Sequence, residues 1–158
     1  MKLTEKLSLI DELQNEISSL GVDKNKLFEP LVQVCKQITA SDRASLFLYN
    51  DETKLIVSEV AQGLSEKIYI ELGEGLVGKC ALSKEPIIES NVDDSQSFNS
   101  DIDMTSGYIT CNTLTLPILG EDDNLLGVIQ LLNKELGNYD SMDVKLLSSI
   151  ASLAAKYI

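Results

Sequence analysis

The sequence predicts an α+β domain in which an antiparallel sheet of five to six strands carries helices from both chain ends on one face. Three observations support this fold class. Long stretches of helical periodicity lie near the two ends, short apolar runs rich in strand formers fill the middle, and short polar turns join neighbouring runs. Short turns produce antiparallel neighbours, and helices outside such a sheet indicate an α+β architecture.

The first helix is expected over residues 2–20, with Gly21 at its end. It has a thin apolar seam with a seven-residue repeat, interrupted by Lys6. The seam consists of Leu3, Ile10, Leu13, Ile17 and Leu20. Such a narrow seam favours pairing with a helix of a second subunit, and packing on the domain's own core is the alternative. We therefore predict a dimerisation and signalling helix over residues 1–22, followed by the main domain over residues 23–158.

Two further long helices are expected. Asp23 can cap a helix over residues 24–40, and the last helix covers residues 141–158. A short helix over residues 76–83 follows a glycine-rich turn and stops before Pro86. Strands are expected at residues 44–50, 55–61, 67–72, 111–119 and 125–134.

The composition excludes several classes of function. The 158 residues carry a net charge of −12 and have no Lys/Arg cluster, so we expect neither a nucleic-acid partner nor binding to an anionic membrane. No apolar run reaches the length of a membrane span, and the N-terminus lacks the apolar centre of a signal peptide. A cytoplasmic protein, or the cytoplasmic part of a larger one, is the expectation.

The absence of histidine limits the chemistry. Ser-His and Cys-His catalysis and the usual zinc and haem ligands are excluded, so we expect no enzyme, no metal and no resident cofactor. The three cysteines, Cys35, Cys80 and Cys111, are widely spaced among apolar neighbours. We expect small buried hydrophobic residues there rather than disulfides.

Two segments suggest a ligand. The turn "GEGLVGK" at residues 73–79 opens a helix, and the free N–H groups of a helix start can hold an anion. A turn that merely needs glycine is the alternative. The long polar loop from Glu89 to Gly107 holds four aspartates, whose spacing is not that of a calcium-binding EF-hand. We expect this loop to be an acidic lid over a ligand.

Four motifs in order along the chain, "ASDRASLFLYND", "GEGLVGKCALSKEPI", "DSQSFNSDIDMTSGYITCNTLTLPIL" and "LLGVIQLLNK", carry a resemblance. The sequence resembles a GAF domain, specifically the cyclic-nucleotide-binding branch found in phosphodiesterases and some bacterial adenylyl cyclases. The resemblance covers residues 27–158. It implies a GAF/PAS-like fold and a regulatory module that holds cAMP or cGMP between the sheet and the lid.

A short signature marks that branch. The resemblance assigns Asn133, Lys134, Tyr139 and Asp143 to it, with Tyr in place of Phe and Val144 in place of the final Glu. In the family, the lysine pairs with the aspartate and ties the last strand to the last helix. We expect the same ion pair here, acting as a brace rather than as a ligand contact.

The resemblance also implies pocket residues on the sheet and the short helix. Ser45 corresponds to a serine near the purine, and Gln130 stands where some members have an acid. Leu76 and Val77 begin the short helix, where backbone N–H groups face the cyclic phosphate.

Three more positions come from the loop and its end. Asp103 occupies an acidic position that reads the base, and Ser106 and Thr110 match hydroxyl positions near the base and the phosphate. The chain also departs from the family, because Val60 and Ala61 replace an aromatic-acid pair over the base. Asn99 stands where an aromatic residue can sit.

A regulatory sensor for cAMP or cGMP is therefore the expected function. It would act as a homodimer and pass its signal through the terminal helices to a partner domain or subunit. A ligand-free dimerisation module is one alternative. A reductase of free methionine sulfoxide, which shares the fold, is the other. That enzyme needs a cysteine where this chain has Val77, with Cys80 three residues further on.

Overall fold

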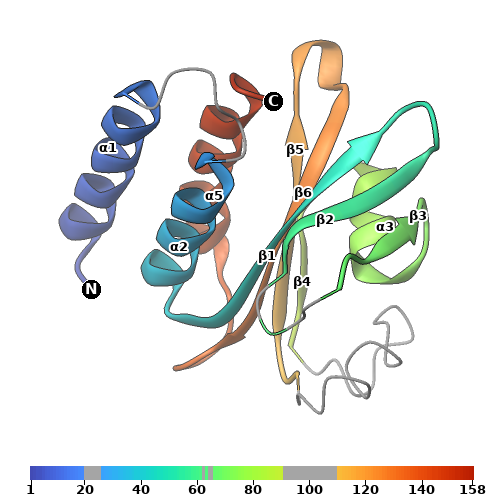
Figure 1. The fold of residues 1–158 in the computed structure, drawn as a ribbon. Coiled ribbons are helices and arrows are strands. Elements are labelled where there is room, and N and C mark those ends of the chain that lie inside the picture. The colour runs from blue at the N-terminus through green and yellow to red at the C-terminus, as the bar shows by residue number, and fades with distance from the viewer. Residues whose placement is uncertain (20–25, 62, 64–65, 91–109) are drawn as a thin grey trace.

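The computed structural model describes residues 1–19, 26–61, 63, 66–90 and 110–158. At its centre is a six-stranded antiparallel sheet with the order β3-β2-β1-β6-β5-β4 (Figure 1). The strands are β1 (Ser41–Asn50), β2 (Leu55–Ala61), β3 (Tyr69–Glu71), β4 (Ile87–Glu89), β5 (Thr113–Leu119) and β6 (Leu125–Lys134). The predicted α+β fold with an antiparallel sheet of five to six strands is confirmed.

The helices form layers on the two faces of this sheet. One face carries α2 (Phe28–Thr39) and α5 (Ser141–Ala155), with α1 (Leu3–Ser19) outside them, and the other face carries the short helix α3 (Gly75–Ser83) (Figure 1). A 3₁₀ turn, η3 (Glu121–Asp123), joins β5 to β6. Successive side chains of a strand alternate between these two environments. Leu46 of β1 therefore packs under the terminal helices, and Phe47 packs under α3.

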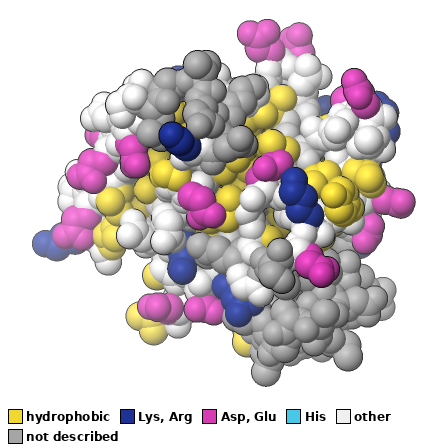
Figure 2. Space-filling model, in the orientation of Figure 1, with side chains coloured by type: hydrophobic (Ala, Val, Ile, Leu, Met, Phe, Trp, Pro, Cys, Tyr) yellow, Lys and Arg dark blue, Asp and Glu magenta, His cyan; other side chains and the backbone are white. Residues whose placement is uncertain are grey.

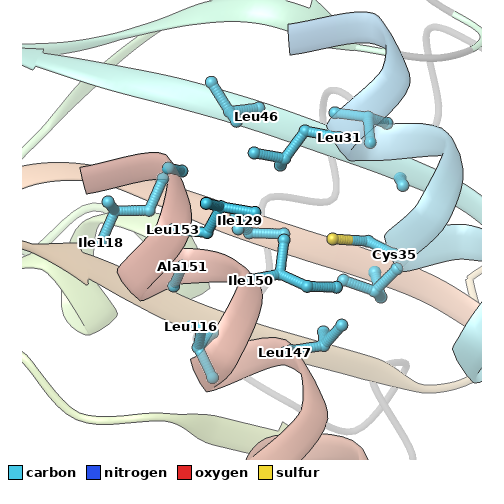
Figure 3. Packing of buried hydrophobic residues seen from close by; sticks show 14 of the residues in the cluster. Leu31, Cys35, Leu46, Leu116, Ile118, Ile129, Leu147, Ile150, Ala151 and Leu153 are labelled. Atoms are coloured by element: carbon cyan, nitrogen blue, oxygen red, sulfur yellow. The ribbon is translucent and has the colours of Figure 1, made fainter. Parts of the chain in front are cut away.

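The larger core lies between the sheet and the terminal helices. Figure 3 shows Leu31 and Cys35 of α2 and Ile150 of α5 in one cluster with Leu46 and Ile129 of the central strands. Each is at most 1% exposed. Burying one large side chain in this way stabilises the fold by roughly 1.5–3 kcal/mol. This core holds the sheet rigid, so that its other face can carry polar groups.

The largest differences from the predicted helix boundaries are at the start of α2 and the end of α5. α2 begins at Phe28 rather than at residue 24, and its N-cap residue, Leu27, makes no side-chain cap; the expected cap, Asp23, lies outside the described residues. Leu27 is nevertheless buried in the same core as the helix that follows it. α5 ends at Ala155 because the backbone of Lys156 and Tyr157 turns more tightly, with bonds to residues three positions earlier.

Strand boundaries also differ. β4 was not predicted, because three residues are too few for an alternation pattern. β5 begins at Thr113 rather than at residue 111, β3 covers only Tyr69–Glu71, and β1 begins at Ser41 rather than at residue 44. The bounds of β6 are those predicted.

The apolar seam of α1 is partly used within the chain. Leu13 and Ile17 are buried in the larger core, and Ile10 packs against its edge. Leu3 is 47% exposed, and the fifth member, Leu20, lies outside the described residues. Leu13 and Ile17 therefore pack on the domain's own core, which was the alternative, and Leu3 is the seam residue among those described that is exposed and open to a partner.

Acidic side chains are scattered over the face shown in Figure 2, with single basic ones between them. This pattern fits the net charge of −12. None of the helices in the described ranges is long and apolar enough to cross a membrane.

Candidate ligand-binding site

A row of polar side chains crosses the sheet on the face that carries α3. In the strand register, Ser45 of β1 lies opposite Gln130 of β6, and Gln130 lies opposite Thr115 of β5. Phe47 is two residues from Ser45 on β1, and Val128 is two residues from Gln130 on β6, and both pack against α3. Because side chains two residues apart on a strand share a face, the polar row is on the face that carries α3. Neighbouring strands are about 4.8 Å apart, so the three side chains lie close together on this face.

The hydroxyl groups of this row are buried. Ser45 is 8% exposed and Thr115 is fully buried, with its Oγ1 accepting a hydrogen bond from Nε2 of Gln130 at 3.2 Å. Thr113, two residues before Thr115 on the same face, is also fully buried. Among the described residues its Oγ1 has no hydrogen-bond partner. Such an unsatisfied group costs about 1–3 kcal/mol, and a ligand atom that bonded it would remove that cost.

The start of α3 offers backbone groups to a ligand. The side chains of Leu76 and Val77 are buried, and their backbone N–H groups belong to the first turn of the helix. The N-cap residue, Glu74, makes no side-chain cap, and its carboxylate instead accepts from the N–H of Glu71 at 3.1 Å. Gly75 opens the helix at a positive φ of 61°. Uncapped N–H groups at a helix start attract anions.

The chain's single arginine lies on the same face of the sheet. Arg43 is two residues before Ser45 on β1 and opposite Leu132 of β6. Its guanidinium lies against Gly63, where an added Cβ would be 2.3 Å from Nη1. A guanidinium binds phosphate oxygens well. Sequence reasoning missed this residue, although one arginine beside 25 acidic residues, two positions from Ser45, was a visible signal.

The expected ion pair at the end of β6 is present. Nζ of Lys134 lies 2.5 Å from Oδ2 of Asp143, whose side chain is only 2% exposed. The same oxygen accepts from the N–H of Asp140 at 3.0 Å, and Oδ1 of Asp140 accepts from the N–H of Asp143 at 3.0 Å. This reciprocal capping box fixes the start of α5. It also holds the pKa of Asp140 below its usual value, mainly through the bond from the Asp143 N–H.

Tyr139 closes the gap between β6 and α5. Its ring lies under Lys134, with Nζ 5.9 Å from the ring centre. Its hydroxyl is 2.6 Å from Oγ of Ser41, which in turn is 2.7 Å from Oγ1 of Thr39. All of these partners belong to the fold rather than to the polar row. The geometry is therefore that of a brace.

The cysteines differ in exposure. Cys35 and Cys80 are buried and Cys111 is exposed, so the expectation of burial is wrong for Cys111. Burial raises the pKa of the Cys35 thiol to about 12 and that of Cys80 to about 12. The Cys80 thiol also donates to the carbonyl oxygen of Glu85 at 3.3 Å. Neither buried thiol forms a nucleophilic thiolate near neutral pH.

The predicted site residues thus fall into three groups. The structure brings Ser45 and Gln130 together, and it places the start of α3 over the same face. Thr110 is buried at the approach to β5. Asp103 and Ser106 lie outside the described residues, as do Asn99 and the expected lid from residue 91 on. The sequence reasoning missed Thr113 and Thr115.

One expectation about the pocket wall is wrong. Val60 was expected beside Ala61 over the base, but it is buried in the core under the terminal helices. The cause is a bulge: Leu46 pairs with Val60 and Phe47 pairs with Ser58, which leaves Glu59 as an extra residue. Of the two residues only Ala61, opposite Ser45, is on the face that carries α3.

The antiparallel sheet carries the terminal helices on one face and α3, with the polar row, on the other, and a match to a family of sensory and regulatory modules goes with this fold. The chain belongs to the GAF domain family, whose model matches residues 23–158.

Among curated proteins, the chain is 27% identical to a cGMP-specific 3′,5′-cyclic phosphodiesterase of Drosophila mojavensis and 29% identical to that of Drosophila sechellia. Each match covers 89% of this chain. The chain spans only 14% and 13% of the lengths of these relatives.

Solved structures share the fold. The GAF domain of a phosphoenolpyruvate-protein phosphotransferase from Coxiella burnetii gives a TM-score of 0.87 at 20% identity, covering 99% of this chain and 94% of the other. Free methionine-R-sulfoxide reductase of Neisseria meningitidis gives 0.81 at 16% identity, covering 96% and 87%. At these identities the likeness concerns the fold alone.

Proposed function

We propose that this domain is a regulatory sensor that binds a cyclic nucleotide, cAMP or cGMP, between α3 and the polar row of the sheet. The observation that carries the proposal is the buried row of Ser45, Gln130 and Thr115, with the unsatisfied hydroxyl of Thr113 beside it. Hydroxyl and amide groups in such a row can bond the ring nitrogens of a purine and the hydroxyl of its ribose.

Two local groups, the start of α3 and the guanidinium of Arg43, favour a negatively charged ligand. A cyclic nucleotide carries one negative charge, which a domain of net charge −12 repels at long range. The uncapped start of α3 and the guanidinium of Arg43 supply positive potential on this face. An anionic ligand is therefore favoured over a cation here.

The relatives support the choice of ligand class. Proteins named for cGMP-specific cyclic phosphodiesterase activity match most of this chain. Because the chain spans about an eighth of their lengths, we propose that it serves a larger cytoplasmic signalling protein. We also propose a homodimer through the terminal helices, with the exposed Leu3 and Leu7 of α1 at its interface.

Titration calorimetry with cAMP, cGMP and cyclic dinucleotides tests the proposal. Saturable binding of one cyclic mononucleotide per chain is the expected result. If none of these compounds releases or absorbs heat at millimolar concentration, the ligand-free dimerisation module replaces the sensor.

Thr113→Val separates ligand contact from fold stability. Valine has nearly the shape of threonine, so the variant removes an unsatisfied hydroxyl and leaves the packing intact. The free energy of unfolding should stay unchanged or rise by about 1 kcal/mol, because no bond within the described residues is lost. Ligand affinity should fall by about 3–10-fold, the value of one hydrogen bond. Urea denaturation and calorimetry measure the two effects.

Thr115→Val is the matched control. Its hydroxyl accepts from Gln130, so its loss leaves that amide without an acceptor and should lower stability by about 1 kcal/mol. Equal destabilisation by the two valine variants, with no change in affinity for Thr113→Val, would remove Thr113 from the site.

The reductase remains as a second candidate because a free methionine-R-sulfoxide reductase shares the fold. Of the three thiols, only that of Cys111 is exposed. Turnover of free methionine sulfoxide with a thiol reductant, lost in Cys111→Ser, would support this candidate and contradict a purely regulatory role.

A further inference from the structure

Beside the polar row, the side chains of two asparagines, Asn112 and Asn133, each accept hydrogen bonds from the backbone at or next to the other. Oδ1 of Asn133 accepts from the N–H of Cys111 at 2.6 Å and from that of Asn112 at 3.3 Å. In return, Oδ1 of Asn112 accepts from the N–H of Lys134 at 2.8 Å. The Asn133 N–H completes the set by donating to the carbonyl oxygen of Asn112 at 2.9 Å. We call Asn112 and Asn133 the asparagine clamp.

The backbone at the clamp is specialised for this arrangement. Asn133 has a positive φ of 56°, a conformation that asparagine tolerates better than most residues. This turn of the chain points its amide at the two N–H groups just before β5. Asn112 is 8% exposed, and its Nδ2 donates to the carbonyl oxygen of Gly137, between β6 and α5, at 3.4 Å. The clamp therefore touches both β5 and the β6–α5 connection.

The clamp lies between the candidate site and a terminal helix. On one side, its partners Cys111 and Asn112 are the two residues between Thr110 and Thr113, which are both buried. On the other side, the residue after Asn133 is Lys134, which binds Asp143 in the first turn of α5. The backbone beside Thr113 is thus joined to the start of α5 through the hydrogen bonds of the clamp, the Lys134 residue and its ion pair with Asp143.

We infer that Asn112 and Asn133 are positioning residues that couple the candidate site to the N-terminus of α5. A shift of the backbone at 110–113 changes the position of Asn133, and with it that of Lys134 and the helix start. The identity of the ligand, a cyclic nucleotide, rests on the proposed function. The coupling is a property of the empty domain and is tested without any ligand.

Native-state hydrogen exchange of the empty domain is the first test. Asn133→Gly keeps the positive φ and removes the amide, whereas Asn133→Asp keeps an acceptor oxygen. We expect exchange in the first turns of α5, at residues 144–147, to rise about tenfold in Asn133→Gly and to stay near the original rate in Asn133→Asp. Asn112→Ala, which removes both the acceptor for the Lys134 N–H and the donor to Gly137, should raise exchange at residues 144–147 in the same way, and it replaces Asn133→Gly if that variant fails to fold.

Asn50→Gly is the matched control. Oδ1 of Asn50 also accepts from two backbone N–H groups, those of Glu52 and Thr53, at the far turn between β1 and β2. Its loss should leave exchange in α5 unchanged. Equal exchange rates in α5 for Asn50→Gly and Asn133→Gly would overturn the inference.

A reciprocal experiment separates coupling from a local loss of structure. Asp143→Asn perturbs the α5 end, and it should speed exchange of the backbone N–H groups of residues 113–115. In the Asn133→Gly background the same substitution should have no further effect on those groups. Additive effects of the two substitutions would contradict coupling.

With cAMP or cGMP at saturation, the unaltered domain should show protection at the start of α3 and at the start of α5. Asn133→Gly should keep the protection at α3 and lose it at α5. Protection of α5 that survives in Asn133→Gly would overturn the coupling and leave the proposed function standing. Absence of binding to the unaltered domain would instead overturn the proposed function, while the exchange results in the empty domain would still decide the coupling.

Discussion

Lys134→Ala should lower the free energy of unfolding by about 3–5 kcal/mol, the usual cost of leaving one partner of a buried ion pair alone. The reason is the burial of Asp143, whose side chain is 2% exposed while that of Lys134 is 16% exposed. Without the ammonium, Oδ2 of the carboxylate keeps the N–H of Asp140 as its one partner within the described part of the chain. Equilibrium urea denaturation measures the loss.

The chain offers an exposed ion pair as the control. Lys54 binds Asp51 at 2.8 Å, with side chains 64% and 85% exposed, and such pairs contribute about 0–1 kcal/mol. Lys54→Ala should therefore change little. If Lys134→Ala cost no more than Lys54→Ala, the brace between β6 and α5 would not exist as an energetic unit.

Ligand affinity distinguishes a brace from a ligand contact at Lys134. A brace predicts that affinity and stability fall together in Lys134→Ala. Low temperature or a stabilising co-solvent that restores the fold should then restore binding. Loss of binding at full stability would mean that Lys134 contacts the ligand.

Gly78→Ala should destabilise the domain by about 1–3 kcal/mol, although alanine normally favours a helix over glycine by about 1 kcal/mol. The sign is reversed because α3 lies against the turn that precedes it. A Cβ on Gly78 would be 2.4 Å from the carbonyl oxygen of Glu71 and 3.0 Å from the nitrogen of Gly73. Both atoms are backbone, so α3 itself must move. Ligand affinity should fall with it, because the helix start moves too.

Gly120→Ala is the control for this substitution. A Cβ there would meet the side chain of Leu126 at 3.0 Å, and a side chain can shift where backbone cannot. Thermal denaturation should show a smaller loss than for Gly78→Ala. A stabilised Gly78→Ala variant would show that α3 is not seated as closely as the structure has it.

The elements that sequence reasoning predicted best are those whose patterns are long. The apolar run of β6 ends at polar Asn133-Lys134, and its bounds were predicted correctly. The faces of α2 and α5 follow from their periodicity. β4 was missed because it has three residues. The seam of α1 could not be assigned, because a heptad repeat looks the same whether its partner is the chain's own core or a second subunit.

The candidate site was predictable only in part. The resemblance supplied Ser45 and Gln130, and alternation in "TLTL" could have supplied Thr113 and Thr115 as residues of one face. Whether Thr113 and Thr115 face α3 or the terminal helices depends on how the strands pair. The bulge at Glu59, which turns Val60 to the opposite core, has no signal in the sequence. Short-range pattern thus predicts alternation, whereas only the folded sheet decides which side meets α3.

Hydrogen exchange tests most directly whether a cyclic nucleotide binds between α3 and the polar row. The experiment compares the domain without ligand with the domain saturated by cAMP or cGMP. We expect slower exchange in the first turn of α3, at residues 75–79, and in β5 at residues 113–115, with no change at the distant β1–β2 turn. Protection confined to other parts of the chain, or no protection with either nucleotide, would contradict a binding site between α3 and the polar row.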